Sequence, residues 1–416
     1  MDDFGESKMK HILVISIDEL WLKGKNRQQY TRSGIEHINA VLKAHHKEKF
    51  TYKVQSERLY YTSNVFFSEE TVDALTKVPG LAYVSRCKML DRLPYENLEN
   101  VYEEVLKELS FLETGGVTFR ALVRRVDKSF SQSSVLIGRE IGHRVITKYP
   151  NAKVDLKNAT LVIDVRILPN HVAITTQTKK AIGGLPWGTT GSAVTMLSGG
   201  FDSPVASYLM AKRGVKQAFV FFHAYPYVGR EVLSKIRSLS SHLAQYQKQS
   251  HLYVVPFGEL QAKISQNCRE EYKTLIFRKF MIDMANIISD KIGADAIITG
   301  DCIGQVSSQT MQNLHLMDKV SKRMIIRPLM GFNKLEILNL ASSIGTHDIS
   351  ILPHDDACSL FASKNPIINP NPEYWQSWVE KSDFTTEVNE AFEKTEAFSI
   401  NLKGEIYKKD FFSYDS

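Results

Sequence analysis

The stretch Ser198-Gly199-Gly200-Phe201-Asp202-Ser203 decides how the central part of this chain is interpreted. It follows an apolar run at residues 193–197, which is typical of a buried strand, and it precedes residues 204–214, which are typical of a helix. Pro204 suits the first helical position, and Gly214 suits the helix end. A strand that enters a short Gly/Ser loop and then a helix directs backbone N–H groups at one point, which suits a phosphate.

Asp202 is the acidic residue of this loop. A carboxylate repels phosphate, so its place is explained by a Mg²⁺ ion held between Asp202 and the phosphates. The loop is not a Walker loop, because it contains no Gly-x-x-x-x-Gly-Lys-Ser/Thr pattern. A plain Gly-rich turn is the alternative, but the full hexapeptide between strand and helix favours nucleotide binding. The pattern resembles the PP-loop of ATP pyrophosphatases, which release pyrophosphate and transfer AMP.

The composition is that of an ordinary globular protein. With 416 residues the chain is expected to hold roughly two to four domains. Hydrophobic residues make up 43% and charged residues 24%. No apolar run is long enough to span a membrane, and residues 1–6 do not begin a signal peptide, so we expect no membrane association. The net charge of +6 permits a polyanionic partner without requiring one.

The four cysteines, Cys87, Cys268, Cys302 and Cys358, are widely spaced. No Cys-x-x-Cys pair occurs, so the sequence signals neither a zinc site nor an iron–sulfur cluster. Widely spaced cysteines of this kind are typical of a reducing compartment, and we expect a cytoplasmic protein.

Changes of pattern divide the chain into segments with expected boundaries at residues 1–72, 73–180, 181–370 and 371–416. Helical patterns are expected at 30–43, 133–147 and 383–395, and strand patterns at 11–17, 52–65, 160–167 and 398–407. A Gly/Pro-rich linker at residues 183–186 precedes a series of nearly continuous apolar strands at 194–197, 218–222, 251–255, 296–299 and 324–328. Such strands, alternating with helices, predict a mainly parallel sheet that is covered on both faces.

Several blocks occur in order along residues 10–370. They are LKGKNR (22–27), RRVDKSF (124–130), GREIG (138–142), VDLKN (154–158), GGLP (183–186), MLSGGFDS (196–203), TG (299–300), GQVSSQT (304–310) and IRPL (326–329). Together they resemble the tRNA 4-thiouridine synthetases, also called thiamine-biosynthesis sulfur-transfer proteins (the ThiI family). The resemblance implies an α/β protein with an N-terminal ferredoxin-like α+β unit, a THUMP domain and a PP-loop (adenine nucleotide alpha hydrolase-like) domain.

Three features depart from the family pattern. Asp18 stands where the family usually has a glycine, and Cys302 where it has a small or aliphatic residue. The rhodanese-like domain of the long family members is not expected here, because few residues follow Pro370. The chain therefore resembles a short member, and the role of residues 371–416 stays open.

The resemblance also implies the residues of an ATP site. The implied ATP contacts are Met196, Leu197, Ser198, Gly199, Gly200, Asp202, Ser203, Phe221, Phe222, Arg278, Gly300 and Gln309. By composition alone the apolar members are strand core, and Arg278 is a helix-surface arginine; both interpretations stay open. Lys334 is implied as a cation that stabilises charge developing on the α-phosphate. Asp202 is the implied metal ligand.

Cys358 aligns with the cysteine that carries sulfur in the family. A free cysteine is more often a small buried hydrophobe than a nucleophile. Its loop setting favours accessibility, but the neighbouring Asp355 and Asp356 disfavour a thiolate, so a cation from elsewhere in the fold is needed.

The basic residues of the first two segments are candidates for RNA binding. Short basic stretches are by default solvated surface. The THUMP resemblance favours contact with the phosphates of a folded RNA by Lys23, Lys25, Arg27, Arg120, Arg124, Arg125, Lys128 and Arg139.

The function implied is that of an ATP-dependent tRNA sulfurtransferase, which adenylates uridine-8 of tRNA and replaces its O4 with persulfide sulfur. The implied cofactors are ATP and Mg²⁺, and the implied partners are tRNA, a cysteine desulfurase and a thiamine sulfur-carrier protein. Two alternatives are a PP-loop enzyme acting on a small molecule and a non-catalytic RNA-binding protein. The sequence leaves open the identity of the desulfurase, a part in thiamine synthesis, a homodimer and a resolving role for Cys302.

Overall fold

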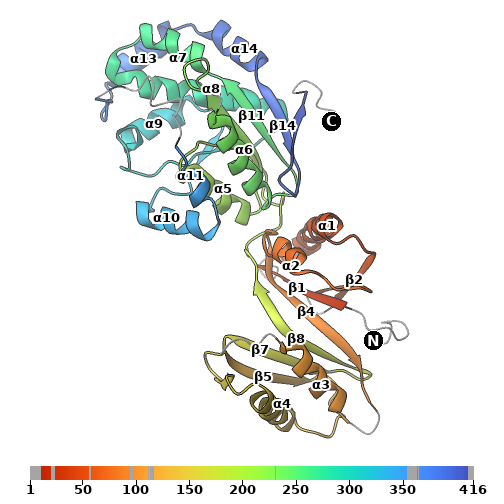
Figure 1. The fold of residues 1–416 in the computed structure, drawn as a ribbon. Coiled ribbons are helices and arrows are strands. Elements are labelled where there is room, and N and C mark those ends of the chain that lie inside the picture. The colour runs from red at the N-terminus through yellow and green to blue at the C-terminus, as the bar shows by residue number, and fades with distance from the viewer. Residues whose placement is uncertain are drawn as a thin grey trace. The chain divides into compact units, whose positions relative to one another are not determined.

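The computed structural model describes residues 11–19, 24–55, 58–93, 97–110, 112, 117–229, 231–353, 363 and 365–410. The chain forms two compact units. Unit 1 contains Met1–Gly24, Val41–Lys77 and Leu81–Gly183, and unit 2 contains Lys25–Ala40, Val78–Gly80 and Gly184–Ser416. Figure 1 shows the elements of both. The segment boundaries at residues 72, 180 and 370 stay predictions.

Unit 1 is built on one sheet with the strand order β2-β3-β1-β4-β8-β7-β5-β6. The strands are β1 (His11–Ile17), β2 (Phe50–Gln55), β3 (Arg58–Ser63), β4 (Leu81–Asp91), β5 (Thr118–Arg125), β6 (Lys153–Val154), β7 (Leu161–Ile167) and β8 (His171–Lys180). Strand β5 pairs in parallel with β6 and β7, whereas β7, β8, β4, β1, β3 and β2 pair antiparallel. The ferredoxin-like and THUMP segments therefore share a continuous hydrogen-bonded sheet, through β4 and β8.

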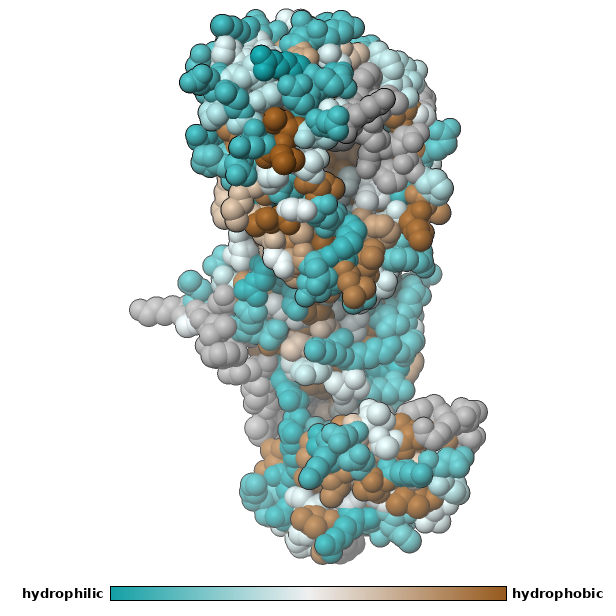
Figure 2. Space-filling model, turned by 90° about the vertical axis from the view of Figure 1, so that its left-hand side faces the viewer, coloured by the Kyte–Doolittle hydropathy of each residue, from teal (hydrophilic) through white to brown (hydrophobic). Residues whose placement is uncertain are grey.

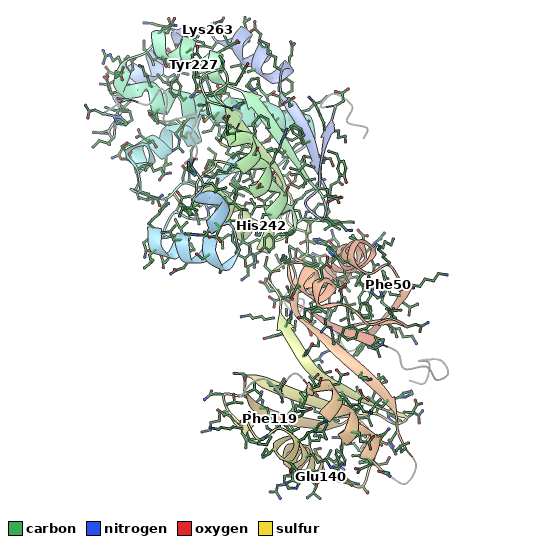
Figure 3. The ribbon with its side chains drawn as sticks, viewed as in Figure 1. Phe50, Phe119, Glu140, Tyr227, His242 and Lys263 are labelled. Carbon is green, nitrogen blue, oxygen red and sulfur yellow. The ribbon has the colours of Figure 1, made fainter. Side chains whose placement is uncertain are left out.

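The helices that begin before residue 183 are α1 (Arg27–His45), α2 (Glu69–Thr76), α3 (Glu99–Glu108) and α4 (Ser134–Lys148). Along β7 every second residue is buried, as expected for a sheet with one covered face. Phe119 is fully buried in a core that also holds Val101 of α3 and Ile137 of α4 (Figure 3). The opposite side of β5 carries Arg120 and Arg124, which are thus left for other contacts.

Unit 2 contains a sheet with the strand order β13-β12-β9-β10-β11-β14-β15. The strands are β9 (Ser192–Met196), β10 (Lys216–His223), β11 (Ser250–Pro256), β12 (Ala296–Ile298), β13 (Met324–Ile326), β14 (Glu396–Ile400) and β15 (Ile406–Lys409). The strands from β13 to β11 run parallel, and β14 and β15 are antiparallel additions at one edge. The expected α/β fold with a mainly parallel sheet is confirmed.

Helices cover both faces of this sheet (Figure 1). They are α5 (Asp202–Lys212), α6 (Glu231–Ala244), α7 (Gly258–Gln266), α8 (Lys273–Ile292), α9 (Met311–Val320), α10 (Lys334–Ser343), α11 (His347–Ser350), α13 (Pro372–Lys381) and α14 (Thr385–Glu393). Helices α5, α6 and α10 pack on one face, and α7, α8, α9, α13 and α14 contribute to the core on the other. Burial on both sides explains why these strands are apolar at nearly every position.

The C-terminal segment corrects one expectation. A single strand was expected at 398–407, but the structure has β14, a turn and β15. Asn401 accepts backbone hydrogen bonds from Lys403 and Glu405, and Gly404 adopts a positive φ of 77°, which together reverse the chain. The expected tail is thus an integral part of unit 2, because β14 pairs with β11 and Trp378 packs in the α8 core.

The surface of the molecule is mixed. On the face drawn in Figure 2, apolar side chains lie among hydrophilic ones. Among the residues that the structure describes, no helix is both long enough and apolar enough to cross a membrane.

Candidate nucleotide-binding site

The Ser198–Ser203 loop connects β9 to α5 at the carboxyl end of the sheet. The Ser198 backbone N–H donates to the Ser203 hydroxyl at 2.8 Å, which closes the loop on itself. Helix α5 begins at Asp202 without a side-chain cap, so its first backbone N–H groups can serve an anion. The loop also lies at the topological switch point of the sheet, because β10 and β12 lie on opposite sides of β9. Open α/β sheets bind their ligands at such a point.

A cavity of about 260 Å³ opens beside this loop. The expected ATP contacts that line it are Met196, Leu197, Ser198, Asp202, Ser203, Phe221, Phe222, Arg278, Gly300 and Gln309. Gly199 and Gly200 belong to the loop but not to the lining. Gly300 permits the close approach of β12 to the loop, because a Cβ at this position would lie 2.7 Å from the Ser203 backbone nitrogen.

The polar atoms of the cavity fit a ligand with hydrogen-bonding groups. Thr274 Oγ1 and Gln309 Oε1 are buried, and neither has a hydrogen-bond partner among the described residues. Buried polar atoms are normally hydrogen-bonded, so we expect a ligand in this cavity to supply the partners of these two atoms. Aromatic and thioether side chains from Phe221, Phe222 and Met281 supply apolar walls. This combination suits a nucleotide.

Asp202 lies at the meeting point of three elements. Its Oδ1 is 2.8 Å from Lys334 Nζ, and its Oδ2 accepts a hydrogen bond of 2.7 Å from Gln305 Nε2. Lys334 is the first residue of α10 and follows Asn333, which forms a capping box with Glu336. The capping box holds the start of α10 in place and thereby directs Lys334 toward the loop.

Sequence reasoning missed Asp301, which organises the inner wall of the cavity. Its carboxylate accepts two hydrogen bonds from Arg278 Nη2 at 2.7 and 2.8 Å, and one from Thr299 Oγ1 at 2.8 Å. Arg327 Nε lies 3.4 Å away. Burial alone would raise the pKa of Asp301, but Arg278, Thr299 and Arg327 outweigh it and hold the pKa below its usual value. An acid directly after β12 and Gly300 was the available signal.

The residues present fit a magnesium ion only together with phosphates. Among the described residues, no group of three or more His, Cys, Asp or Glu side chains could hold a metal. Mg²⁺ commonly uses one or two carboxylates and completes its shell with substrate phosphates and water. Asp202 beside a phosphate loop is such a carboxylate, so the site fits a nucleotide-bound Mg²⁺.

The structure describes three of the four cysteines, and all three have a raised thiol pKa. Cys358 lies outside the described residues. Burial raises the pKa of the Cys302 thiol, whose Sγ donates to the Phe332 carbonyl at 2.9 Å. Burial also raises the pKa of Cys87 and of Cys268 to about 11. None of these three is disposed to form a thiolate at neutral pH, which weakens a resolving role for Cys302.

Several of the expected RNA-binding residues either lie outside the described residues or form hydrogen bonds within the protein. Lys23 lies outside the described residues, as does the side chain of Lys25. Arg27 is half-buried. In unit 1, Arg125 donates to the Phe130 and Gln132 carbonyls at 2.7 and 3.2 Å, and Arg120 to the Leu156 carbonyl at 3.3 Å.

Three expected residues of unit 1 project from its surface: Arg124, Lys128 and Arg139. Arg166 of β7 was not predicted from the sequence. It lies opposite Arg124 of β5 in the register of the two strands. Its side chain makes an ion pair of 3.2 Å with Asp164. Of the expected residues of unit 1, Arg124, Lys128 and Arg139 are thus the exposed cations available to a polyanion.

The fold and this site define a class. A parallel sheet covered on both faces, with a Ser/Gly/Asp loop opening a helix at its switch point, is a PP-loop nucleotide-binding domain. Models of protein families match the chain in three places: "Thiamine biosynthesis protein (ThiI)" at residues 188–384, "ThiI ferredoxin-like domain" at 12–85, and "THUMP domain" at 95–177.

Relatives extend the match over nearly the whole chain. A probable tRNA sulfurtransferase of Clostridium kluyveri is 35% identical over 94% of this chain and 100% of its own length. A second one, of Brevibacillus brevis, is 32% identical over 96% of this chain and 99% of its own. The chain therefore belongs to the ThiI family of tRNA sulfurtransferases.

A solved structure agrees. The crystal structure of a 4-thiouridine synthetase–RNA complex with bound ATP superposes with a TM-score of 0.82 at 30% identity, covering 95% of this chain and 100% of that one.

Proposed function

We propose that this protein is an ATP-dependent tRNA sulfurtransferase that converts uridine-8 of tRNA to 4-thiouridine. The observation that carries the proposal is that Asp202 and Arg278 line one phosphate-loop cavity, where Asp202 is also paired with Lys334. It is supported by the relatives named tRNA sulfurtransferase and by the neighbour that is a 4-thiouridine synthetase with RNA and ATP.

The first step is adenylation of the uridine. Its O4 attacks the α-phosphorus of ATP, the bond to pyrophosphate breaks, and the N3 proton is released to solvent. The loop N–H groups hold the phosphates, and Asp202 would hold Mg²⁺, which offsets phosphate charge. Lys334 is assigned to the charge that builds on the α-phosphate. The uridine has to leave its contacts within the tRNA to reach the cavity.

The second step is sulfur transfer from a persulfide on Cys358. The terminal sulfur attacks C4 and AMP leaves, which joins C4 to Cys358 through a disulfide bond. A thiol then attacks Cys358 Sγ and releases the thiocarbonyl product, which leaves Cys358 in a mixed disulfide. A second thiol reduces that disulfide and frees Cys358, so each cycle oxidises two thiols to one disulfide, a two-electron reduction. Because Cys302 is buried with a raised pKa, the proposal assigns these thiols to an external reductant.

The sulfur reaches Cys358 from a cysteine desulfurase, which we propose as the persulfide donor. A thiamine sulfur-carrier protein is a second proposed acceptor, and the proposed setting is the cytoplasm. The RNA is assigned to the exposed arginines and lysines of unit 1, which would bind phosphates and recognise the shape of the tRNA.

The experiment is ATP–pyrophosphate exchange with and without tRNA, followed by thiolation with a persulfide donor. We expect exchange that depends on tRNA and a thiolated product found by nucleoside mass spectrometry. Exchange with a small molecule alone would favour a PP-loop enzyme of another kind, and no exchange at all would favour an RNA-binding protein. Either result contradicts the proposal.

Cys358→Ser separates the two steps. Adenylation needs no thiol, so exchange should persist, whereas single-turnover thiolation should stop because serine cannot carry sulfane sulfur. Cys302→Ser is the matched control and should thiolate normally with an external thiol. Full thiolation by Cys358→Ser would remove the persulfide carrier from the mechanism.

A further inference from the structure

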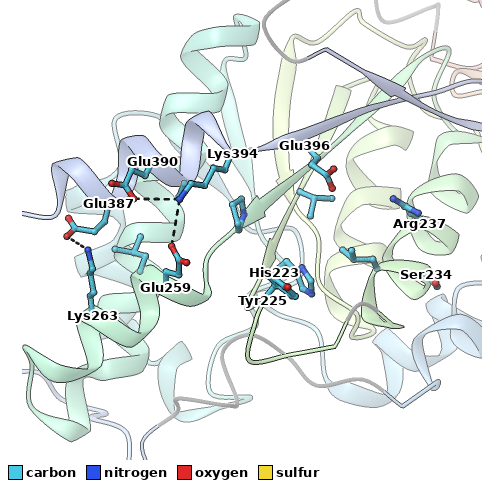
Figure 4. Close-up of a pocket in the computed structure, with 15 residues that line it drawn as sticks. His223, Tyr225, Ser234, Arg237, Glu259, Lys263, Glu387, Glu390, Lys394 and Glu396 are labelled. Carbon is cyan, nitrogen blue, oxygen red and sulfur yellow. Dashed lines mark hydrogen bonds and ion pairs between the residues drawn. The ribbon is translucent and has the colours of Figure 1, made fainter.

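A second cavity in unit 2, of about 660 Å³, lies outside the site already described. It opens at the carboxyl ends of β10 and β11 and extends to the start of β14 (Figure 4). None of the expected ATP contacts lines it. Its volume is within the range of small-molecule sites. Its walls come from the loop after β10, from α6 and α7, and from α14.

Aromatic rings connect this cavity with the nucleotide site. Phe221 lines the nucleotide cavity, and its ring centroid is 6.1 Å from that of His223 at an interplanar angle of 29°. The next ring, Tyr225, follows at 6.0 Å and 31°, and is 48% exposed. His223 and Tyr225 line the second cavity, where Figure 4 shows them side by side. The ring of His223 is held by the Gly229 carbonyl, 3.2 Å from its Nε2.

Most of the charged side chains that line the cavity are paired with a side chain of opposite charge. The carboxylates that line it have lysine partners: Glu387 with Lys263 at 2.9 Å, Glu390 and Glu259 with Lys394 at 3.7 and 3.8 Å, and Glu396 with Lys408 at 2.7 Å. Arg237 lines the cavity from α6 and is exposed, and its guanidinium lies 4.9 Å from the centre of the Phe398 ring. In the described part of the chain it has no carboxylate partner.

We propose that this cavity binds a nucleoside phosphate unit of the substrate RNA, next to the nucleotide that enters the ATP site. An exposed ring over which a base can stack, beside a cation that can bind a phosphate, is the combination that recognises unpaired nucleotides. The inference rests on the proposed function, because it takes RNA as the substrate. The spacing of the three rings, about 6 Å each, places the two sites within reach of adjacent nucleotides.

The outer wall of the cavity comes from residues beyond the ThiI match, which ends at residue 384. Glu387, Glu390 and Ala391 of α14, with Lys394 directly after this helix, form the side opposite Arg237, and Glu396 at the start of β14 continues the wall. The C-terminal segment thereby acquires a role, since the pairing of β14 with β11 holds this wall in place.

The experiment measures tRNA affinity without ATP over a series of salt concentrations, using the full chain. Tyr225→Ala should weaken binding about tenfold by loss of stacking, while Tyr225→Phe, which keeps the ring, should bind as the parent protein. Arg237→Ala should lower the salt slope by about one phosphate contact. Tyr407→Ala and Arg269→Ala are matched controls: Tyr407 is 55% exposed, and Arg269 is exposed and stacks on Tyr374.

Free uridine monophosphate, added as a competitor, distinguishes the two sources of the ligand. Competition only at concentrations far above that of tRNA supports an RNA strand as the occupant. If uridine monophosphate binds tightly and Arg237→Ala abolishes this while tRNA affinity is unchanged, the cavity holds a free nucleotide and the proposal is overturned. Unchanged tRNA binding by both variants overturns it as well. Failure of thiolation with these binding effects intact would contradict the proposed function alone.

Discussion

Lys334 Nζ lies 2.8 Å from Asp202 Oδ1, although 132 positions separate the two residues in the sequence. The lysine neutralises a carboxylate that stands beside a phosphate loop. A magnesium nucleotide supplies a competing cation for Asp202 and anionic oxygens for Lys334. We therefore expect this ion pair to break when the nucleotide binds, which would release Lys334 toward the phosphates.

Asp202→Asn should lower tRNA-dependent ATP–pyrophosphate exchange roughly a hundredfold or more, because the amide neither binds Mg²⁺ well nor pairs with Lys334. The affinity for tRNA, measured by filter binding, should stay unchanged. Normal exchange by this variant would exclude Asp202 from the reaction. A parallel loss of tRNA affinity would instead indicate that the loop had misfolded.

Asp301→Asn should raise the KM for ATP about tenfold or more, because the neutral amide offers Arg278 one oxygen acceptor instead of two and no ion pair, and a hydrogen bond to a charged group contributes on the order of 1.5–3 kcal/mol. The measurement is exchange as a function of ATP concentration. Asp318→Asn is the matched control, since Asp318 pairs with Arg327 at 2.7 Å on the exposed side of the same network. Equal effects of both variants would assign Asp301 a purely structural role.

Arg124→Glu should weaken tRNA binding and lower its salt slope by about one unit or more, since an exposed cation that contacts phosphate releases counterions. Arg124→Lys, which keeps the charge, should restore most of the slope. Arg125 is a poorer choice because it also holds the loop carbonyls at Phe130 and Gln132. An unchanged slope for Arg124→Glu would remove this surface from the RNA interface.

His37 should make unfolding depend on pH. It is fully buried on α1, and neither ring nitrogen has a hydrogen-bond partner among the described residues. Burial, with a smaller contribution from Lys248, lowers its pKa to about 3. Between pH 6.5 and 3 the unfolded state therefore binds the proton and the folded state does not. The contribution of His37 to stability is fully present above pH 6.5 and is lost as the pH falls.

His37→Leu should remove this loss, which amounts to at most about 1.4 kcal/mol per pH unit. Denaturant unfolding of both proteins between pH 7 and 4 tests it, with the exposed His315→Leu as the control. Identical pH dependence of the His37→Leu variant and its parent would contradict the burial of a neutral ring.

The strands of unit 2 could be predicted because apolar runs are a local property of the sequence. The run at residues 194–197, for example, is part of β9 and its exit. Asn401 and Gly404 carried a turn signal that the alternating pattern at 398–407 masked.

The contacts between the side chains of the site could not be predicted in the same way. The contact of Gln305 with Asp202 joins residues 103 positions apart, and Arg278 reaches Asp301 from a different element. Such contacts depend on how β12, α5 and α8 pack, which no local pattern encodes.

The antiparallel pair β14 and β15 also determines what the edge of the sheet presents to other molecules. Without it, β11 would expose a row of unpaired N–H and C=O groups next to apolar Leu252 and Val254, a template for pairing with a second chain. The outer strand that replaces it is short and ends in Lys408 and Lys409, whose charges oppose such pairing. A chain cut before residue 396 should therefore aggregate during folding, even if every residue of the nucleotide site were retained.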